Sequence, residues 1–274
     1  MKFFKALFRF YINSSIHVAL AVVALLVFTC LQFKITFDYG LKSFVFFGSV
    51  TGYNFVKYAP VAKLHHRSLT NQLRQIQIFS FCCFLGLCVS AFFVNYKVLF
   101  VCGVLGLLTL LYAIPIQNKN LRETSVLKVF IIALIWATVS FVLPFLQENA
   151  LANNINSMWW FNYTERFIWI LLLMIPFEIR DVRFDETYLK TLVSIFGIPK
   201  IKMISVLVLI ALATHKYFGN SYQHNLTYII IYMSLTGFIL ASKKVQKPYF
   251  ASFWVEALPI FWVITWYLFN VSSI

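Results

Sequence analysis

Three acidic residues, Glu178, Asp181 and Asp185, form an E-x-x-D-x-x-x-D run in a chain of 274 residues that has only nine acids in all. Spacings of three and four predict that the three side chains share one helical face, provided that the helix continues through the run. Carboxylate oxygens suit Mg²⁺ that bridges to a phosphate-bearing substrate. Arg180 and Arg183 lie between the acids, so the run also fits a solvated loop in which opposite charges neutralise each other.

The segments that must position these acids are strongly apolar. The chain is 61% hydrophobic and 12% charged, which is far from the composition of a soluble domain. Segments of roughly 20 apolar residues, long enough to cross a bilayer, recur at 14–33, 43–62, 76–94, 98–116, 128–146, 165–180, 203–218, 226–242 and 252–271. We therefore expect an all-α integral membrane protein, a single domain over residues 1–274 with about nine transmembrane helices.

The basic residues predict the topology. If the N-terminus is cytoplasmic, seventeen of the 23 Lys and Arg residues lie in cytoplasmic segments and five on the opposite side, while Lys57 lies within the second span. Such a bias follows the positive-inside rule and predicts a multi-pass protein of the cytoplasmic (inner) membrane. The net charge of +14 is then mainly a topology signal, with some attraction to anionic lipid. Nucleic acid is not expected as a partner, because the charges are dispersed among membrane loops.

The residues that follow the acids carry a resemblance. Asp181-x-x-x-Asp185 is followed by Lys190-Thr191-Leu192 and then by Gly197. This order resembles the second signature of the UbiA superfamily of membrane prenyltransferases, and the expected nine-span layout is similar to that family as well. Tyr112 and Lys128 are a looser match. The resemblance implies a UbiA-like fold in which two acidic motifs hold Mg²⁺ on a prenyl diphosphate and face each other across a cavity.

The first acidic motif of that family, N-D-x-x-D-x-x-x-D, is degenerate in this chain. Of the corresponding stretch only Asn54 survives, while Phe55, Tyr58 and Ala62 stand where the family has aspartates. Lys57 enters between them and offers a point charge to phosphate. Ionising a prenyl diphosphate needs strong stabilisation of the leaving group, and the loss removes about half of the anionic metal ligands.

The resemblance assigns eight site residues: as ligands of Mg²⁺, Asn54, Glu178, Asp181 and Asp185; as diphosphate-binding bases, Lys57, Arg67, Lys128 and Lys190. Two hypotheses follow. The first is a divergent prenyltransferase that moves a prenyl group from a prenyl diphosphate to a small acceptor. The second is a catalytically inactive UbiA-like fold that acts as a structural or lipid-binding subunit of a membrane complex, with protein subunits as partners. A lipid transporter is less favoured, because the spans lack the broken-helix pattern of transporters.

Overall fold

The computed structural model of the protein describes residues 2–63, 71–113, 125–183, 191–219 and 222–270. Every regular element within these ranges is a helix, so the all-α prediction is confirmed for the described chain. The chain divides into two compact units. The first comprises Met1–Ile116 and Val139–Asn153, and the second comprises Gln117–Thr138 and Asn154–Ile274. The single domain expected from the sequence stays a prediction.

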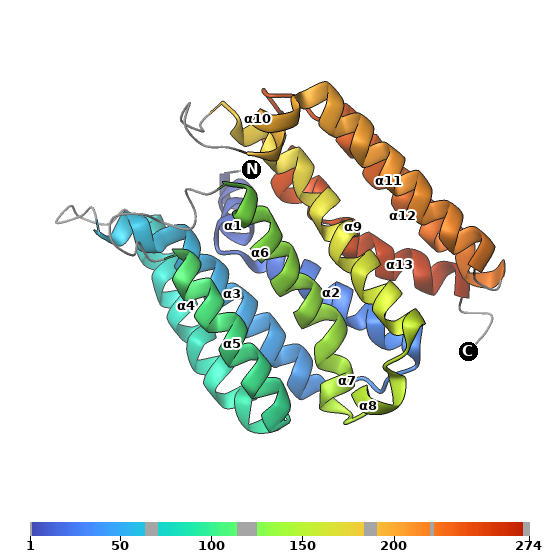
Figure 1. The fold of residues 1–274 in the computed structure, drawn as a ribbon. Helices are drawn as coiled ribbons and strands as arrows, with labels where there is room; N and C mark the ends of the chain where they lie inside the picture. Colours follow the sequence, from blue (N-terminus) through green and yellow to red (C-terminus); the bar gives the residue numbers. More distant parts are fainter. Residues whose placement is uncertain (1, 64–70, 114–124, 184–190, 220–221, 271–274) are drawn as a thin grey trace. The chain divides into compact units, whose positions relative to one another are not determined.

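The first unit is built mainly from five helices, of which α2, α3 and α4 pack side by side and α5 also contacts α3 (Figure 1). Its elements are α1 (Lys2–Asn13), α2 (Ile16–Phe33), α3 (Tyr39–Lys63), α4 (Asn71–Ser90) with the 3-10 turn Ala91–Phe93, α5 (Tyr96–Ala113), α7 (Leu143–Gln147) and α8 (Leu151–Asn154).

Small residues let the helices of the first unit approach closely. Ala19, Val50 and Cys83 form a buried cluster, one residue each from α2, α3 and α4. A Cβ built on Gly40 would lie 2.7 Å from the Cβ of Phe93, so no larger residue fits there without movement. Close backbone approach through small residues is the usual way in which helices pack in membranes.

The second unit contains the acidic run. Its elements are α6 (Ser125–Ala137), α9 (Ser157–Asp181), α10 (Leu192–Phe196), α11 (Ile198–Gly219), α12 (Tyr222–Ala241), the π-helical segment Phe250–Val255 and α13 (Leu258–Asn270). Helix α6 packs against α9, and α12 lies between α11 and α13 (Figure 1). The buried indoles of Trp169 and Trp262 meet at 4.8 Å between ring centroids and tie α9 to α13.

Membrane character is supported by helix length and composition. Within the described ranges, five helical stretches are long and apolar enough to cross a membrane: Ile16–Phe33, Asn71–Phe93, Val126–Gln147, Ile198–Phe218 and Phe250–Phe269. Tyr96–Leu111 and Leu226–Ala241 are apolar but shorter. The second and sixth predicted spans fall on α3 and α9, which are not among the five. The count of nine crossings and the side that each loop faces stay predictions.

Candidate functional site

The last turn of α9 carries two of the three predicted acids. Helix α9 begins after Asn156, whose side-chain oxygen accepts a hydrogen bond from the amide of Trp159 at 2.8 Å and so caps the helix. The helix ends at Asp181. Glu178 and Asp181 are therefore one turn apart, as expected from their spacing of three. The condition that one helix runs through all three acids is not met, because α9 ends at Asp181. Asp185 falls outside the described residues, and its place beside the other two acids stays a prediction.

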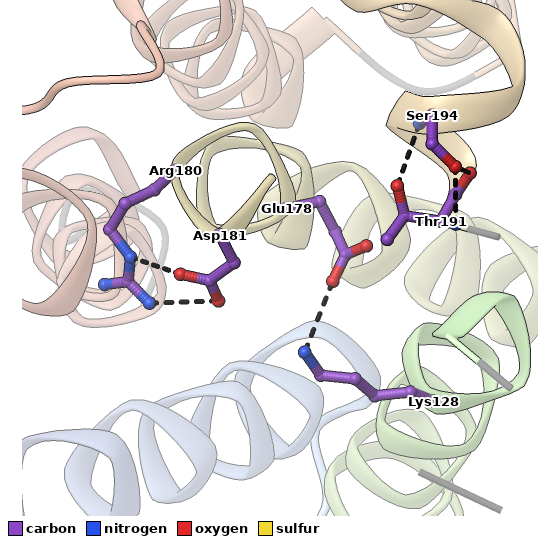
Figure 2. Close-up of polar contacts among 6 residues, drawn as sticks. All are labelled: Lys128, Glu178, Arg180, Asp181, Thr191 and Ser194. Atoms are coloured by element: carbon purple, nitrogen blue, oxygen red, sulfur yellow. Dashed lines mark hydrogen bonds and ion pairs between the residues drawn. The ribbon is translucent and has the colours of Figure 1, made fainter. Parts of the chain in front are cut away.

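Glu178 is a nearly buried carboxylate with a basic partner from a second helix. Its side chain is 3% exposed, and its Oε1 lies 3.5 Å from the ammonium Nζ of Lys128 on α6 (Figure 2). A charge taken this far from water is stable only when it is paired. The structure thus brings together one predicted metal ligand and one predicted phosphate-binding base.

Asp181 pairs with its neighbour in the chain. The Nε of Arg180 donates to Oδ1 at 2.7 Å and the Nη2 donates to Oδ2 at 3.2 Å, so the contact is bidentate (Figure 2). Both side chains are partly exposed, and screening by solvent keeps such a pair to about 1 kcal/mol or less. The pair can therefore open at little cost when a better ligand for either group is present.

Thr191, which belongs to the Lys190-Thr191-Leu192 pattern, caps the N-terminus of α10. Thr191 Oγ1 accepts from the amide of Ser194 at 2.8 Å, and Ser194 Oγ accepts from the amide of Thr191 at 2.8 Å, which makes a capping box at the start of α10 (Figure 2). Gly197 has a φ of 76° and separates α10 from α11. These residue types are explained by local backbone geometry alone.

A metal centre is not assembled by the described residues. Among them, no group of three or more His, Cys, Asp and Glu side chains lies close enough to hold an ion. Glu178 and Asp181 supply two carboxylates, each already beside a base. Asp185, Lys190 and Arg67 fall on stretches that the structure does not describe. The assignment of Mg²⁺ stays a prediction.

Asn54 from the degenerate motif is committed to hydrogen bonds inside the first unit. Its Oδ1 accepts from Ser15 Oγ at 2.7 Å, and its Nδ2 donates to the carbonyl oxygen of Ser14 at 3.0 Å and to Ser80 Oγ at 2.8 Å. The residue is buried. The oxygen that a metal would require thus already accepts a hydrogen bond from the turn between α1 and α2.

Two further residues of the motif bind the same turn. Lys57 Nζ and Tyr58 Oη donate to the carbonyl oxygen of Asn13, at 3.1 Å and 2.8 Å. The stretch that resembles a metal motif therefore clamps α3 to the junction of α1 and α2. Asn54 and Lys57 belong to the first unit, and Glu178 and Asp181 to the second. The expected meeting of the two signatures across a cavity stays a prediction.

Two hollows among the described residues, one in each unit, are lined by residues other than the predicted ligands. One of about 670 Å³ in the first unit is lined by residues that include Asp38 and Phe93, and one of about 510 Å³ in the second by Ala211, Thr214, His215 and Phe218. Glu178, Asp181 and Asn54 line neither of them. An apolar slot for a prenyl tail stays a prediction.

The sequence did not predict a buried charge cluster in the N-terminal half of α9, away from Glu178 and Asp181. Glu165 Oε2 lies 2.7 Å from Lys216 Nζ, which also donates to Asn162 Oδ1 at 2.7 Å. The hydroxyl of Tyr232 donates to Oε1 of Glu165. The guanidinium of Arg166 lies 5.4 Å from a ring centroid of Trp262. The cluster ties α9 to α11, α12 and α13.

A signal for this cluster was present in the sequence. Glu165 and Arg166 open one predicted span, and Lys216 lies near the end of the next. Ionisable residues in membrane segments are costly and face the protein interior. Arg166 and Lys216 are two of the five basic residues predicted to lie on the outer side. No spacing pattern indicates that they are paired, because the residues that Lys216 contacts lie far away in the chain.

Comparison with known proteins found no match to this chain among family models, curated proteins or solved structures. The UbiA resemblance therefore depends on the sequence pattern alone and stays a prediction.

Proposed function

We propose that the protein binds the diphosphate head group of a prenyl lipid at the Glu178–Asp181 end of α9, and that it does so without transferring the prenyl group. The observation that carries the proposal is the ion pair between nearly buried Glu178 and Lys128, next to the partly exposed bidentate pair of Asp181 and Arg180. Two bases and two carboxylates from α6 and α9 thus lie together at one end of a helical unit.

Binding would proceed by exchange of ionic partners. The ammonium of Lys128 and the guanidinium fork of Arg180 would turn from the carboxylates to phosphate oxygens, which an Arg side chain can engage in a bidentate manner. Glu178 and Asp181 would then be free to hold Mg²⁺, with Asp185 as a third carboxylate, and the ion would neutralise charge on the diphosphate. Each charge keeps a partner of opposite sign throughout, so no buried charge is left uncompensated.

The absence of transfer is inferred from the first motif. Breaking the bond between the prenyl carbon and the diphosphate oxygen requires electrostatic stabilisation of the departing diphosphate. Asn54 is held by three hydrogen bonds, and Phe55 and Tyr58 cannot replace aspartate as metal ligands. The first motif supplies a structural clamp in place of a second metal site. A lipid-binding subunit of a membrane complex fits this arrangement.

The proposed architecture is UbiA-like, with about nine membrane crossings and a cytoplasmic N-terminus in the inner membrane. What supports it is the position of the nine apolar segments, the described residues of which fall almost entirely on helices. The seventeen-to-five distribution of basic residues supports the orientation.

Binding of farnesyl diphosphate to the purified protein in detergent, measured by calorimetry with Mg²⁺ and with EDTA, tests the proposal. We expect Lys128→Met and Asp181→Asn each to weaken binding at least tenfold. Glu148→Gln is the matched control, because Glu148 is an exposed acid of the first unit that accepts from the amide of Thr36 at 2.7 Å. The proposal fails if folded wild-type protein does not bind, or if Glu148→Gln weakens binding as much as Asp181→Asn.

Prenyl transfer is the second candidate, favoured by the acidic run at the end of α9. Incubation with labelled prenyl diphosphates and a panel of aromatic acceptors would then give a labelled product and release diphosphate. If wild-type protein forms a labelled product and the Asp181→Asn variant does not, the proposal of binding without transfer is wrong, but the assignment of the site to the end of α9 is supported.

A further inference from the structure

The N-terminal helix α1 is amphipathic, and its charge has a single sign. Residues 2–13 include Lys2, Lys5 and Arg9 but no acid. The spacing of four places Lys5 and Arg9 along one face of the helix. The opposite face carries Phe3, Phe4 and Leu7.

The apolar face of α1 is exposed. Phe3 and Phe4 are each 73% exposed, and Leu7 is 54% exposed. The following turn of the helix is covered, because Phe10 meets Phe79 of α4 at 5.6 Å between ring centroids. Helix α1 thus has an anchored C-terminal end and a free apolar N-terminal half.

Helix α1 cannot itself cross a bilayer. Twelve residues extend for about 18 Å, against a hydrocarbon core of about 30 Å. A short helix with a basic face and an aromatic-rich apolar face is typical of segments that lie in the plane of the membrane interface.

The direction of α1 is fixed by the turn that follows it. Ser15 has a φ of 62°, which breaks the helix before α2 begins at Ile16. Asn13 accepts hydrogen bonds from Lys57 and Tyr58 of α3, as described above. The hydroxyl of Tyr11 is hydrogen-bonded to Nδ1 of His17 at 2.7 Å across the turn. The clamp made by the degenerate motif therefore holds α1 at a set angle and prevents it from extending α2.

We propose that α1 lies in the head-group region of an anionic lipid leaflet, with Phe3, Phe4 and Leu7 inserted between the lipids and Lys5 and Arg9 on lipid phosphates. Charge complementarity selects an anionic surface, because a basic residue near such a surface strengthens binding about fivefold. This role gives the residues of the degenerate motif a function in orienting a lipid-binding helix, independently of the site on α9.

Hydrogen exchange of the full-length protein in nanodiscs tests this inference. Discs of phosphatidylcholine alone are compared with discs that contain phosphatidylglycerol as well. We expect amides of residues 3–13 to exchange at least tenfold more slowly in the anionic discs, and the difference to shrink when salt is raised from 0.05 M to 0.5 M, roughly a threefold shorter screening length. Unchanged exchange in α2 verifies that the fold is intact.

Two triple variants sharpen the test. Lys2→Gln, Lys5→Gln and Arg9→Gln together should abolish the difference between the discs. Lys243→Gln, Lys244→Gln and Lys247→Gln, which remove three positive charges at exposed positions elsewhere in the chain, should preserve it. The inference is overturned if wild-type exchange is equal in both kinds of disc, if the second triple variant loses the difference as well, or if protection appears only when two copies share a disc.

Discussion

Replacing Lys216 by Met removes the positive partner of Glu165, a buried carboxylate in the N-terminal half of α9. The side chains of Lys216 and Glu165 are 3% and 6% exposed, so solvent does not screen their contact at 2.7 Å. Met fills a similar volume and brings no charge. The variant therefore leaves Glu165 with the hydroxyl of Tyr232 and leaves Oδ1 of Asn162 without the ammonium.

The expected cost follows from these contacts. Breaking a buried ion pair from one side costs about 3–5 kcal/mol, because the remaining charge is left uncompensated. The hydrogen bond from Tyr232 and the nearby guanidinium of Arg166 remain and offset part of this loss, so we expect Lys216→Met to lower the free energy of unfolding by about 3 kcal/mol. The double variant Glu165→Gln with Lys216→Met removes both charges of the pair but leaves the buried guanidinium of Arg166 without its neighbouring carboxylate, so we expect it to be less stable than wild type by less than the sum of its two single changes.

Unfolding in mixed micelles with increasing SDS, followed by tryptophan fluorescence, measures these differences. Trp262 is a suitable reporter, since it is buried and lies near Tyr232, at 6.3 Å between ring centroids. Lys200→Met is the matched control, because Lys200 is an exposed residue of the same helix, and we expect a change of about 0.5 kcal/mol or less.

The reasoning fails in either of two cases. The first is a Lys216→Met variant as stable as Lys200→Met, which would mean that Glu165 carries no buried charge. The second is a double variant destabilised by the sum of its single changes, because additivity would show that the two side chains do not interact.

Three further substitutions test the remaining structural claims by the same unfolding assay. Asn54→Leu should cost about 2–4 kcal/mol because it removes hydrogen bonds to Ser14, Ser15 and Ser80, of which Ser14 and Ser15 are buried; a neutral result would contradict the clamp. Thr191→Ala should cost about 1 kcal/mol through the lost cap of α10, and Thr191→Ser should restore it. Gly40→Ala should cost about 1–3 kcal/mol because its Cβ would meet that of Phe93 at 2.7 Å. Gly103→Ala, where the Cβ meets nothing within 4 Å, should be neutral or stabilising, and equal effects at both glycines would refute the steric argument.

Part of the candidate site was predictable because it is local. Glu178 and Asp181 are three residues apart, so a shared helical turn follows from their spacing once the segment is a helix. The end of α9 at Asp181 was not predicted, since the acidic run has no glycine or proline to signal it. The sequence analysis named Lys128 as a phosphate ligand, and the structure places it 3.5 Å from Glu178, an ion pair that no spacing rule indicates.

The helical, apolar character of the described chain follows from the sequence alone, because the length and hydropathy of an apolar segment are properties of short stretches. The roles of the polar residues inside those stretches were decided only by tertiary structure. Asn54 meets Ser15 across 39 residues of chain, Lys216 meets Asn162 across 54, and Tyr232 meets Glu165 across 67. A buried polar group must find a partner, and which partner it finds depends on how helices far apart in the sequence pack together.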